Sequence, residues 1–315
     1  MKVSILIPCY NEESSISLFF EELCSVLRQL KYYQFEMICI DDGSSDATLK
    51  IIEKLSLDDH RIKFISFSRN FGKESAIFAG LKYAAGDYIC LMDADLQHPP
   101  KQIVHYLEAM EEGYDIAASR RITREGEKKI YSWFARRFYK VINRISNVDI
   151  EEGAQDFRMM KKKVVKAILN MPESHRFSKG IFSWVGFKTK WFEYRNVQRI
   201  AGTTKWSFNK SLSYAIDGII SFSTIPLRIS FIIGFLFSIF GFVYAAYIVI
   251  KTIILGSDWP GFPTITSIIL ILGGTILSSL GVIGEYISKI YTEVKDRPIY
   301  IIDRTNIIGE NIEDE

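Results

Sequence analysis

Two carboxylates separated by one residue follow an apolar run, and such a pair can hold a divalent metal ion. Asp93 and Asp95 come directly after residues 88–92, Tyr-Ile-Cys-Leu-Met, whose composition predicts a buried strand. If the chain turns there, the two side chains can converge, with Gln97 nearby. Oxygen ligands of this kind suit Mg²⁺ or Mn²⁺ bound to a diphosphate. The pattern therefore indicates a metal-assisted group transfer.

A second acidic turn, Asp41-Asp42-Gly43-Ser44, follows another apolar run. Two interpretations stay open: a loop built by Asp and Gly, or a carboxylate at the ribose or base of a nucleotide. The chain lacks G-x-G-x-x-G after its first expected strand, and it also lacks G-x-x-x-x-G-K-[ST]. Both absences weaken a dinucleotide-binding or nucleotide-hydrolysing function.

Alternating strand and helix patterns place these acidic motifs at one edge of a sheet. We expect strands at residues 3–7, 36–40, 62–67, 88–92 and 115–119. The helices between them are expected at 12–30, around 49–55 after a cap by Ser44 or Ser45, at 75–85, and after Pro99. The alternation predicts an α/β fold with a mostly parallel sheet, helices on both faces, and ligands at the carboxyl ends of the strands.

Charge and cysteine content argue against other functions. Lys and Arg number 39 against 37 Asp and Glu, a formal net charge of +2, so nothing indicates nucleic acid binding. The four cysteines have no C-x-x-C spacing, and we expect reduced thiols in a cytosolic domain rather than zinc or disulfides. The first apolar run stops at Pro8, which favours a strand inside the cell over a signal peptide.

Two long segments near the C-terminus carry no charge. Residues 229–250 and 262–284 are long enough, at ~1.5 Å of rise per residue, to cross a ~30 Å hydrocarbon core, whereas buried core helices are usually shorter. The connection at 251–261 is short, so both flanks share one side of the membrane. Basic residues gather on those flanks, which by the positive-inside rule places the large N-terminal domain and the tail in the cytoplasm.

The segments beside this hairpin show helical spacing. In residues 206–228 the apolar side chains share one face, which fits either a helix along the membrane surface or an ordinary packed helix. A similar pattern follows the second span until Pro298, and a short strand is expected at 299–302. The expected parts of the chain are 1–205, 206–228, 229–284 and 285–315, the last ending in an acidic tail.

Four stretches carry the central motifs of the chain: Ile7-Pro8-Cys9-Tyr10-Asn11-Glu12, Asp41-Asp42-Gly43-Ser44-Ser45-Asp46, Arg69-Asn70-Phe71-Gly72-Lys73 and Met92-Asp93-Ala94-Asp95-Leu96-Gln97-His98-Pro99-Pro100. Together they resemble family 2 glycosyltransferases, and more narrowly the polyprenyl-phosphate glycosyltransferases, which include dolichyl-phosphate mannose synthases and bactoprenol glucosyltransferases. The resemblance extends over nearly the whole chain through Gln155-Asp156-Phe157-Arg158, Arg199-Ile200-Ala201-Gly202-Thr203-Thr204-Lys205-Trp206 and residues 284–298.

The resemblance implies a glycosyltransferase A-type, Rossmann-like fold and a set of site residues. Residues in the motifs and near the strand ends would bind the nucleotide-sugar: Pro8, Tyr10, Glu12, Asp41, Asp42, Lys73, Asp93, Ala94 and Arg120. The metal, Mg²⁺ or Mn²⁺, would be held by Asp93, Asp95 and Gln97. Catalysis would involve Asp95, Asp156 near the donor sugar, and Arg199 and Lys205 beside phosphate groups. An Arg or Lys near a membrane can also be only an interface anchor.

The resemblance also bears on the substrates. Residues 152–156 and 172–177 look closer to the bactoprenol branch, and Ser119-Arg120-Arg121 departs from the Ser-Arg-Tyr common in mannose synthases. This implies a UDP-sugar donor carrying glucose or N-acetylglucosamine, a polyprenyl (undecaprenyl) phosphate acceptor, and inversion at C1. A GDP-mannose-using mannose synthase, a processive polysaccharide synthase and a non-catalytic membrane scaffold are the alternatives.

A multi-pass protein of the inner (plasma) membrane, with both termini cytoplasmic, is the expected setting. A separate flippase and a downstream glycosyltransferase would act on the lipid-linked product. The resemblance leaves open whether the chain forms a homo-oligomer.

Overall fold

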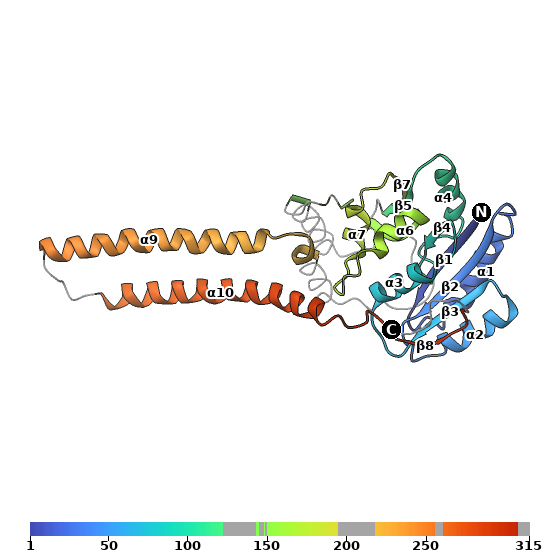
Figure 1. The fold of residues 1–315 in the computed structure, drawn as a ribbon, viewed down its shortest axis with the longest axis horizontal. Helices are drawn as coiled ribbons and strands as arrows, with labels where there is room; N and C mark the ends of the chain where they lie inside the picture. The colour runs from blue at the N-terminus through green and yellow to red at the C-terminus, as the bar shows by residue number, and fades with distance from the viewer. Residues whose placement is uncertain (122–142, 145–147, 149, 195–217, 256–260, 308–315) are drawn as a thin grey trace. The chain divides into compact units, whose positions relative to one another are not determined.

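The computed structural model describes residues 1–121, 143–144, 148, 150–194, 218–255 and 261–307. The chain divides into two compact units, one made of Met1–Gly218 with Arg297–Glu315 and the other of Ile219–Asp296. The first unit holds an eight-stranded sheet and its helices, and the second holds a helical hairpin (Figure 1).

Mostly apolar segments form the first half of the sheet, as expected. Its parallel strands are β1 (Lys2–Cys9), β2 (Gln34–Asp41), β3 (Ile62–Phe67) and β4 (Tyr88–Leu91). The helices of this half are α1 (Ile16–Leu27), α2 (Thr48–Asp58), α3 (Lys73–Tyr83) and α4 (Gln102–Glu111). Because β1 lies between β2 and β4, the loops after these three strands meet at one edge of the sheet.

The other half of the sheet keeps the mostly parallel arrangement that the sequence predicts but adds an antiparallel strand, β6 (Ala154–Lys161). This strand runs antiparallel between β4 and β5 (Ile116–Arg121), and β7 (Thr189–Tyr194) pairs parallel with β5. Polar residues interrupt the apolar pattern of β6, so periodicity does not predict a strand there. Two helices complete this half, α6 (Lys162–Leu169) and α7 (Ser178–Trp184).

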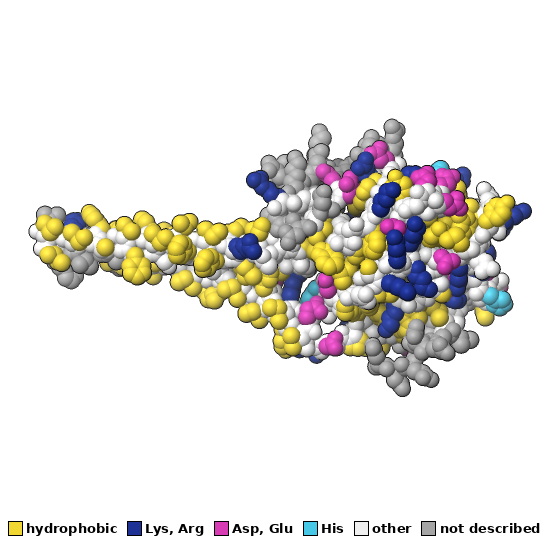
Figure 2. Space-filling model, turned by 45° about the horizontal axis from the view of Figure 1, so that its top comes forward, with side chains coloured by type: hydrophobic (Ala, Val, Ile, Leu, Met, Phe, Trp, Pro, Cys, Tyr) yellow, Lys and Arg dark blue, Asp and Glu magenta, His cyan; other side chains and the backbone are white. Residues whose placement is uncertain are grey.

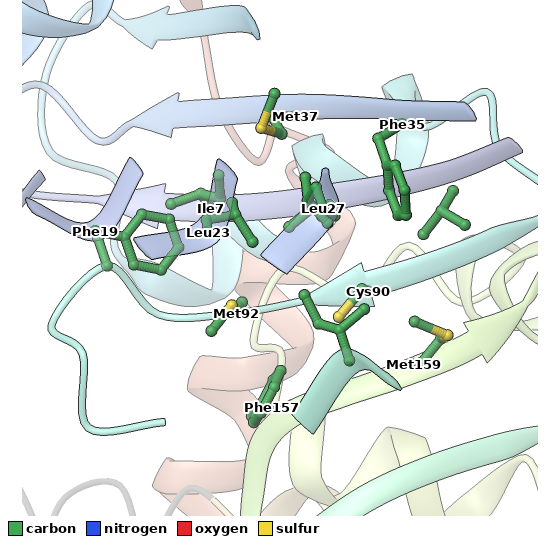
Figure 3. Close-up of a cluster of buried hydrophobic side chains, with 14 of the residues drawn as sticks. Ile7, Phe19, Leu23, Leu27, Phe35, Met37, Cys90, Met92, Phe157 and Met159 are labelled. Carbon is green, nitrogen blue, oxygen red and sulfur yellow. The ribbon is translucent and has the colours of Figure 1, made fainter. Parts of the chain in front are cut away.

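Helices cover both faces of the sheet. Phe19 and Leu23 of α1 pack with Ile7 of β1 in a buried cluster on one face (Figure 3). On the other face, Gly80 of α3 lies against the side chain of Leu6. Successive residues of a strand point to opposite sides, so neighbouring positions of β1 anchor the two helical layers. The sheet edge that carries the acidic motifs is thereby held between two packed layers.

The loop before α2 differs from the expected serine cap. The N-cap position is Ala47, with no side-chain cap bond. Ser44 Oγ instead accepts the backbone N–H of Asn11 at 2.9 Å, and the backbone N–H of Ser45 donates to Asn11 Oδ1 at 2.8 Å. The serines therefore tie the loop after β1 to the loop after β2, and α1 begins at Ile16 rather than at residue 12.

The C-terminal segment returns to the sheet. β8 (Ile302–Thr305) pairs antiparallel with β3, a little later than the expected 299–302. Tyr300 stacks on Phe67 with ring centroids 5.0 Å apart, and Phe67 meets Phe71 edge-on at 5.8 Å. These rings join the returning segment to the loop that leads into α3.

The second unit contains α9 (Ile225–Leu255) and α10 (Phe262–Val294), which lie side by side as a hairpin (Figure 1). Each helix has a stretch long and apolar enough to cross a membrane. Hydrophobic side chains dominate the hairpin surface in the view of Figure 2.

Both helices are longer than the expected spans 229–250 and 262–284. α10 continues through Glu285 and Lys289, as the helical pattern before Pro298 predicts, because a charged side chain does not interrupt the backbone hydrogen bonds of a helix. Tyr286 Oη donates to the backbone carbonyl of Ser223 at 2.6 Å, which fixes the start of α9 to α10. Most of the expected interfacial helix, residues 206–217, lies outside the described residues.

A buried carboxylate stabilises the opposite edge of the sheet. Glu36, with a side chain 3% exposed, pairs with Lys2 Nζ at 2.8 Å and Lys63 Nζ at 2.9 Å. It also accepts hydrogen bonds from Ser4 Oγ and the backbone N–H of Ala85. Burial alone would raise the pKa of Glu36, but these hydrogen bonds lower it to about 2.

We predict that Glu36→Gln lowers the stability of the folded protein by roughly 3 kcal/mol at neutral pH, because both lysines lose their buried partner. The folded pKa of about 2 lies below the unfolded value, so the stabilisation is present at neutral pH and is lost as pH falls from about 4.3 toward 2. Thermal unfolding in detergent measures the effect, with the exposed Glu21→Gln as control. Equal unfolding midpoints for the two variants would contradict the prediction.

Candidate active site

Two adjacent aspartates at the end of β2 are held by the protein in different ways. Asp41 is buried, and its carboxylate accepts the backbone N–H of Ser44 at 3.2 Å and Ser66 Oγ at 2.9 Å. Asp42 accepts the backbone N–H groups of Phe71 at 2.7 Å and Gly72 at 2.9 Å. Burial raises the pKa of Asp42 to about 6, although both N–H groups act to lower it. Asp42 therefore fixes the loop that precedes α3.

The loop after β2 and the loop before α3 are in close contact. Gly43 has φ +64, and a Cβ atom placed there would lie 2.5 Å from the carbonyl carbon of Arg69. Only glycine fits this conformation and this approach without a shift of backbone. The Arg69 guanidinium lies 4.0 Å from the centroid of the Phe71 ring. The segment that ends at Lys73 is thus held from several sides.

Lys73, the first residue of α3, bridges two carboxylates that are far apart in the chain. Its Nζ lies 2.7 Å from Asp93 Oδ1 and 2.8 Å from Asp156 Oδ2. Burial would lower the pKa of Lys73, but the charges of Asp156 and Asp93 raise it above its usual range. Burial would raise the pKa of Asp156, but the charges of Lys73 and Lys179 hold it well below its usual range. Both groups are therefore charged at neutral pH.

The chain turns sharply after β4, at the residues that the sequence predicts to bind a cation. Asp95 Oδ1 accepts the backbone N–H of Gln97 at 3.1 Å, and Leu96 between them has φ +56. In the described part of the chain, no three His, Cys, Asp or Glu side chains are grouped closely enough to hold a metal by themselves. Mg²⁺ is commonly held by one or two carboxylates together with substrate phosphates. Asp93 and Asp95 fit that mode, in which the donor would complete the coordination.

His98 is packed as a structural residue. Its side chain is buried, and its ring lies 5.1 Å from the ring of Phe157. Burial lowers the pKa of His98, although the charges of Asp93 and Asp95 act to raise it. These features favour a neutral ring in the wall of the site.

The expected residues of the first loop occupy the edge beside β2. Pro8 of β1 is in register with Ile40, and Tyr10 and Glu12 follow in the loop. Tyr10 is 37% exposed, which leaves its ring accessible to a ligand. The Glu12 carboxylate accepts Ser15 Oγ at 2.7 Å. Ala94, between Asp93 and Asp95, is buried.

Arg120 is engaged by carboxylates at the end of β5. Its two terminal nitrogens lie 2.6 Å from Glu151 and 2.6 Å from Glu193. A phosphate would have to compete with both of these partners. The other two basic residues expected at phosphates, Arg199 and Lys205, lie outside the described residues.

Lys179 of α7 contributes to the site and is not expected from the sequence. It is half-buried, and its positive charge is among those that lower the pKa of Asp156. A single lysine in a polar stretch carries no sequence signal, so the topology alone brings it to this edge.

Two family models match the chain. The model of glycosyl transferase family 2 matches residues 4–169, and the model of the GtrB C-terminal hairpin matches residues 225–290. The chain belongs to glycosyltransferase family 2, and its mixed sheet is of the glycosyltransferase A type. The apolar helices and the hairpin match together indicate membrane association.

Relatives match along nearly the whole chain. The prophage bactoprenol glucosyl transferase homolog of Escherichia coli (strain K12) is 44% identical over 96% of this chain and 99% of that protein. The bactoprenol glucosyl transferase of Shigella phage SfII is 42% identical over 97% of this chain and 99% of that protein. Among solved structures, glucosyl-3-phosphoglycerate synthase from Mycobacterium tuberculosis is 15% identical, with a TM-score of 0.47 over 70% of this chain and 78% of that chain.

We predict that Gly43→Ala lowers the rate of glycosyl transfer at least about ten-fold, because the added methyl group displaces the loop that presents Lys73. Gly113→Ala is the matched control, since Gly113 also has a left-handed φ, +94, but a Cβ there meets nothing within 4 Å. Initial rates and thermal unfolding midpoints are measured for both variants. Equal activity of the two would show that the contact with Arg69 does not matter for catalysis.

Proposed function

We propose that this protein transfers glucose from a UDP-sugar to a polyprenyl phosphate such as undecaprenyl phosphate. The observation that carries the proposal is the near full-length similarity to proteins named bactoprenol glucosyl transferase, which includes the hairpin. Those names favour glucose over N-acetylglucosamine as the sugar. UDP as the carrier rests on the resemblance of the loop motifs.

The donor would bind where the loops after β1, β2 and β4 meet. Pro8, Tyr10, Glu12 and Asp41 would surround the base and ribose, and Asp93, Asp95 and Gln97 would hold Mg²⁺ or Mn²⁺. Such a cation would neutralise charge on the departing diphosphate. The two ionised carboxylates at Lys73 support the assignment, because they cluster beside the turn that carries Asp95.

The acceptor needs little activation. A phosphate monoester has a second pKa near ~6 and is mostly a dianion at neutral pH, so its oxygen can attack C1 without a general base. The remaining difficulty is bringing two anions together, for which Arg199 and Lys205 would supply positive charge to the acceptor. Asp156, ionised at neutral pH, would orient the donor sugar. A single displacement would invert the anomeric centre.

The hairpin would keep this reaction at the membrane. Two candidate spans with a short connection would bring both flanks to one side, and the basic flanks favour the cytoplasmic side of the plasma (inner) membrane. A glucosylated lipid made there would need a separate flippase and a downstream glycosyltransferase.

We predict that the purified protein, given undecaprenyl phosphate and Mg²⁺ or Mn²⁺, forms a hexosyl-lipid from UDP-glucose. Asp95→Asn should lose at least about 100-fold in rate, because a metal ligand is removed. Asp58→Asn, an exposed change on α2, is the control. Mass spectrometry of the extracted lipid measures the product.

Parallel reactions with UDP-N-acetylglucosamine and GDP-mannose test the other donors. Product from GDP-mannose alone would identify a mannose synthase and overturn the proposal. Folded protein that uses none of the donors would favour a scaffold.

A further inference from the structure

Lys73 forms ion pairs with two carboxylates of the expected donor site. Asp93, one of the expected metal ligands, contacts the ammonium of Lys73 through both oxygens, at 2.7 Å and 2.9 Å. The same ammonium contacts Asp156 at 2.8 Å. A protein cation therefore lies directly beside a carboxylate that would otherwise attract a metal ion.

The position of Lys73 is fixed by its surroundings. Asp42 holds the backbone of Phe71 and Gly72, and Ser75 Oγ donates to the carbonyl of Phe71 at 3.1 Å. The neighbouring Glu74 accepts hydrogen bonds from the backbone and side chain of Ser178 at the start of α7. The backbone that carries Lys73 is thus anchored on both sides.

The Lys73 side chain is not enclosed by the core. The Lys73 side chain is 41% exposed, against 27% for Asp93 and 20% for Asp156, so its tip can leave the carboxylates without unpacking the core. A lysine has a flexible four-carbon stem with a compact charge at its end. Because the backbone is anchored, rotation of this stem can move the ammonium group from one anion to another nearby.

Electrostatics opposes simultaneous binding of Lys73 and a free divalent cation at Asp93. A like charge a few ångströms away raises the free energy of the second cation, and Asp93 has both oxygens engaged already. A nucleotide diphosphate changes this balance, because its negative oxygens can accept both the metal and the ammonium. The metal and the lysine then share a diphosphate instead of competing for a carboxylate.

We propose that Lys73 is a built-in counter-ion that occupies the donor-site carboxylates before substrate binds, so that the divalent metal binds strongly only together with the nucleotide diphosphate. Lys73 then moves to the diphosphate. The inference rests on the proposed function in taking a nucleotide-sugar as the donor. It makes Lys73 a switch between the two states of the site.

Binding of Mn²⁺ to the nucleotide-free protein tests this directly, with unbound Mn²⁺ measured by electron paramagnetic resonance. Lys73→Met should bind Mn²⁺ at least about ten-fold more tightly than the parent, since the competing charge is gone. Lys82→Met removes the same charge from an exposed position of α3 and should leave the affinity unchanged. Lys73→Gln provides a second neutral variant should Lys73→Met not fold, as judged by circular dichroism.

Calorimetric titration with UDP at saturating Mg²⁺ tests the other half of the exchange. Lys73→Met should bind UDP at least about ten-fold more weakly, because the diphosphate loses one of its cations. An unchanged Mn²⁺ affinity in both neutral variants overturns the proposal, as does tight Mn²⁺ binding by the nucleotide-free parent. The Mn²⁺ titration does not depend on glycosyl transfer. If the neutral variants bind Mn²⁺ more tightly as expected, yet the parent transfers no glucose from UDP-glucose, the proposed function is refuted and the counter-ion role is not.

Discussion

The crowding of negative charge at one edge of the sheet is the constraint on which the rest of the site depends. Asp93 and Asp156 come from neighbouring parts of the sheet, and like charges this close need a cation between them. Lys73 supplies that cation, and Asp42 with Gly43 holds the loop that presents it. The protein's own contacts therefore organise this part of the site.

The first four strands and the loops after them could be predicted from sequence because their signals are local. Each of these strands is mostly apolar, and the chemical motifs follow directly at the strand ends, as with Asp93 after β4. Parallel strands bring such ends together without further information. The positions of Asp41, Asp42 and Asp93 at this edge follow from that rule.

The remainder of the site depends on tertiary structure. Asp156 meets Lys73 only because β6 lies antiparallel beside β4. The polar residues of β6 interrupt its hydrophobic periodicity, so the pattern does not predict this strand. Ser44 and Ser45 have the residue types of a helix cap, yet their partner is Asn11 from another loop. Lys179 carries no sequence signal at all. Pairs separated by many residues require the topology before they can be found.

The hairpin shows the same division between local and tertiary information. The two spans can be predicted from the length of their uncharged segments, because a helix that crosses a hydrocarbon core needs about 20 consecutive apolar residues. The helix ends do not follow from charge, since α10 runs on to Val294 through several charged residues. The hydrogen bond between Tyr286 and Ser223, which fixes the base of the hairpin, joins residues that no pattern connects.

A structure of the protein with UDP-glucose and Mn²⁺ bound would show whether the donor diphosphate binds at this acidic edge. We expect the metal on Asp93 and Asp95, the diphosphate beside it, and the Lys73 ammonium in contact with a diphosphate oxygen. A nucleotide bound elsewhere, or Lys73 still bridging Asp93 and Asp156 with the donor in place, would contradict it.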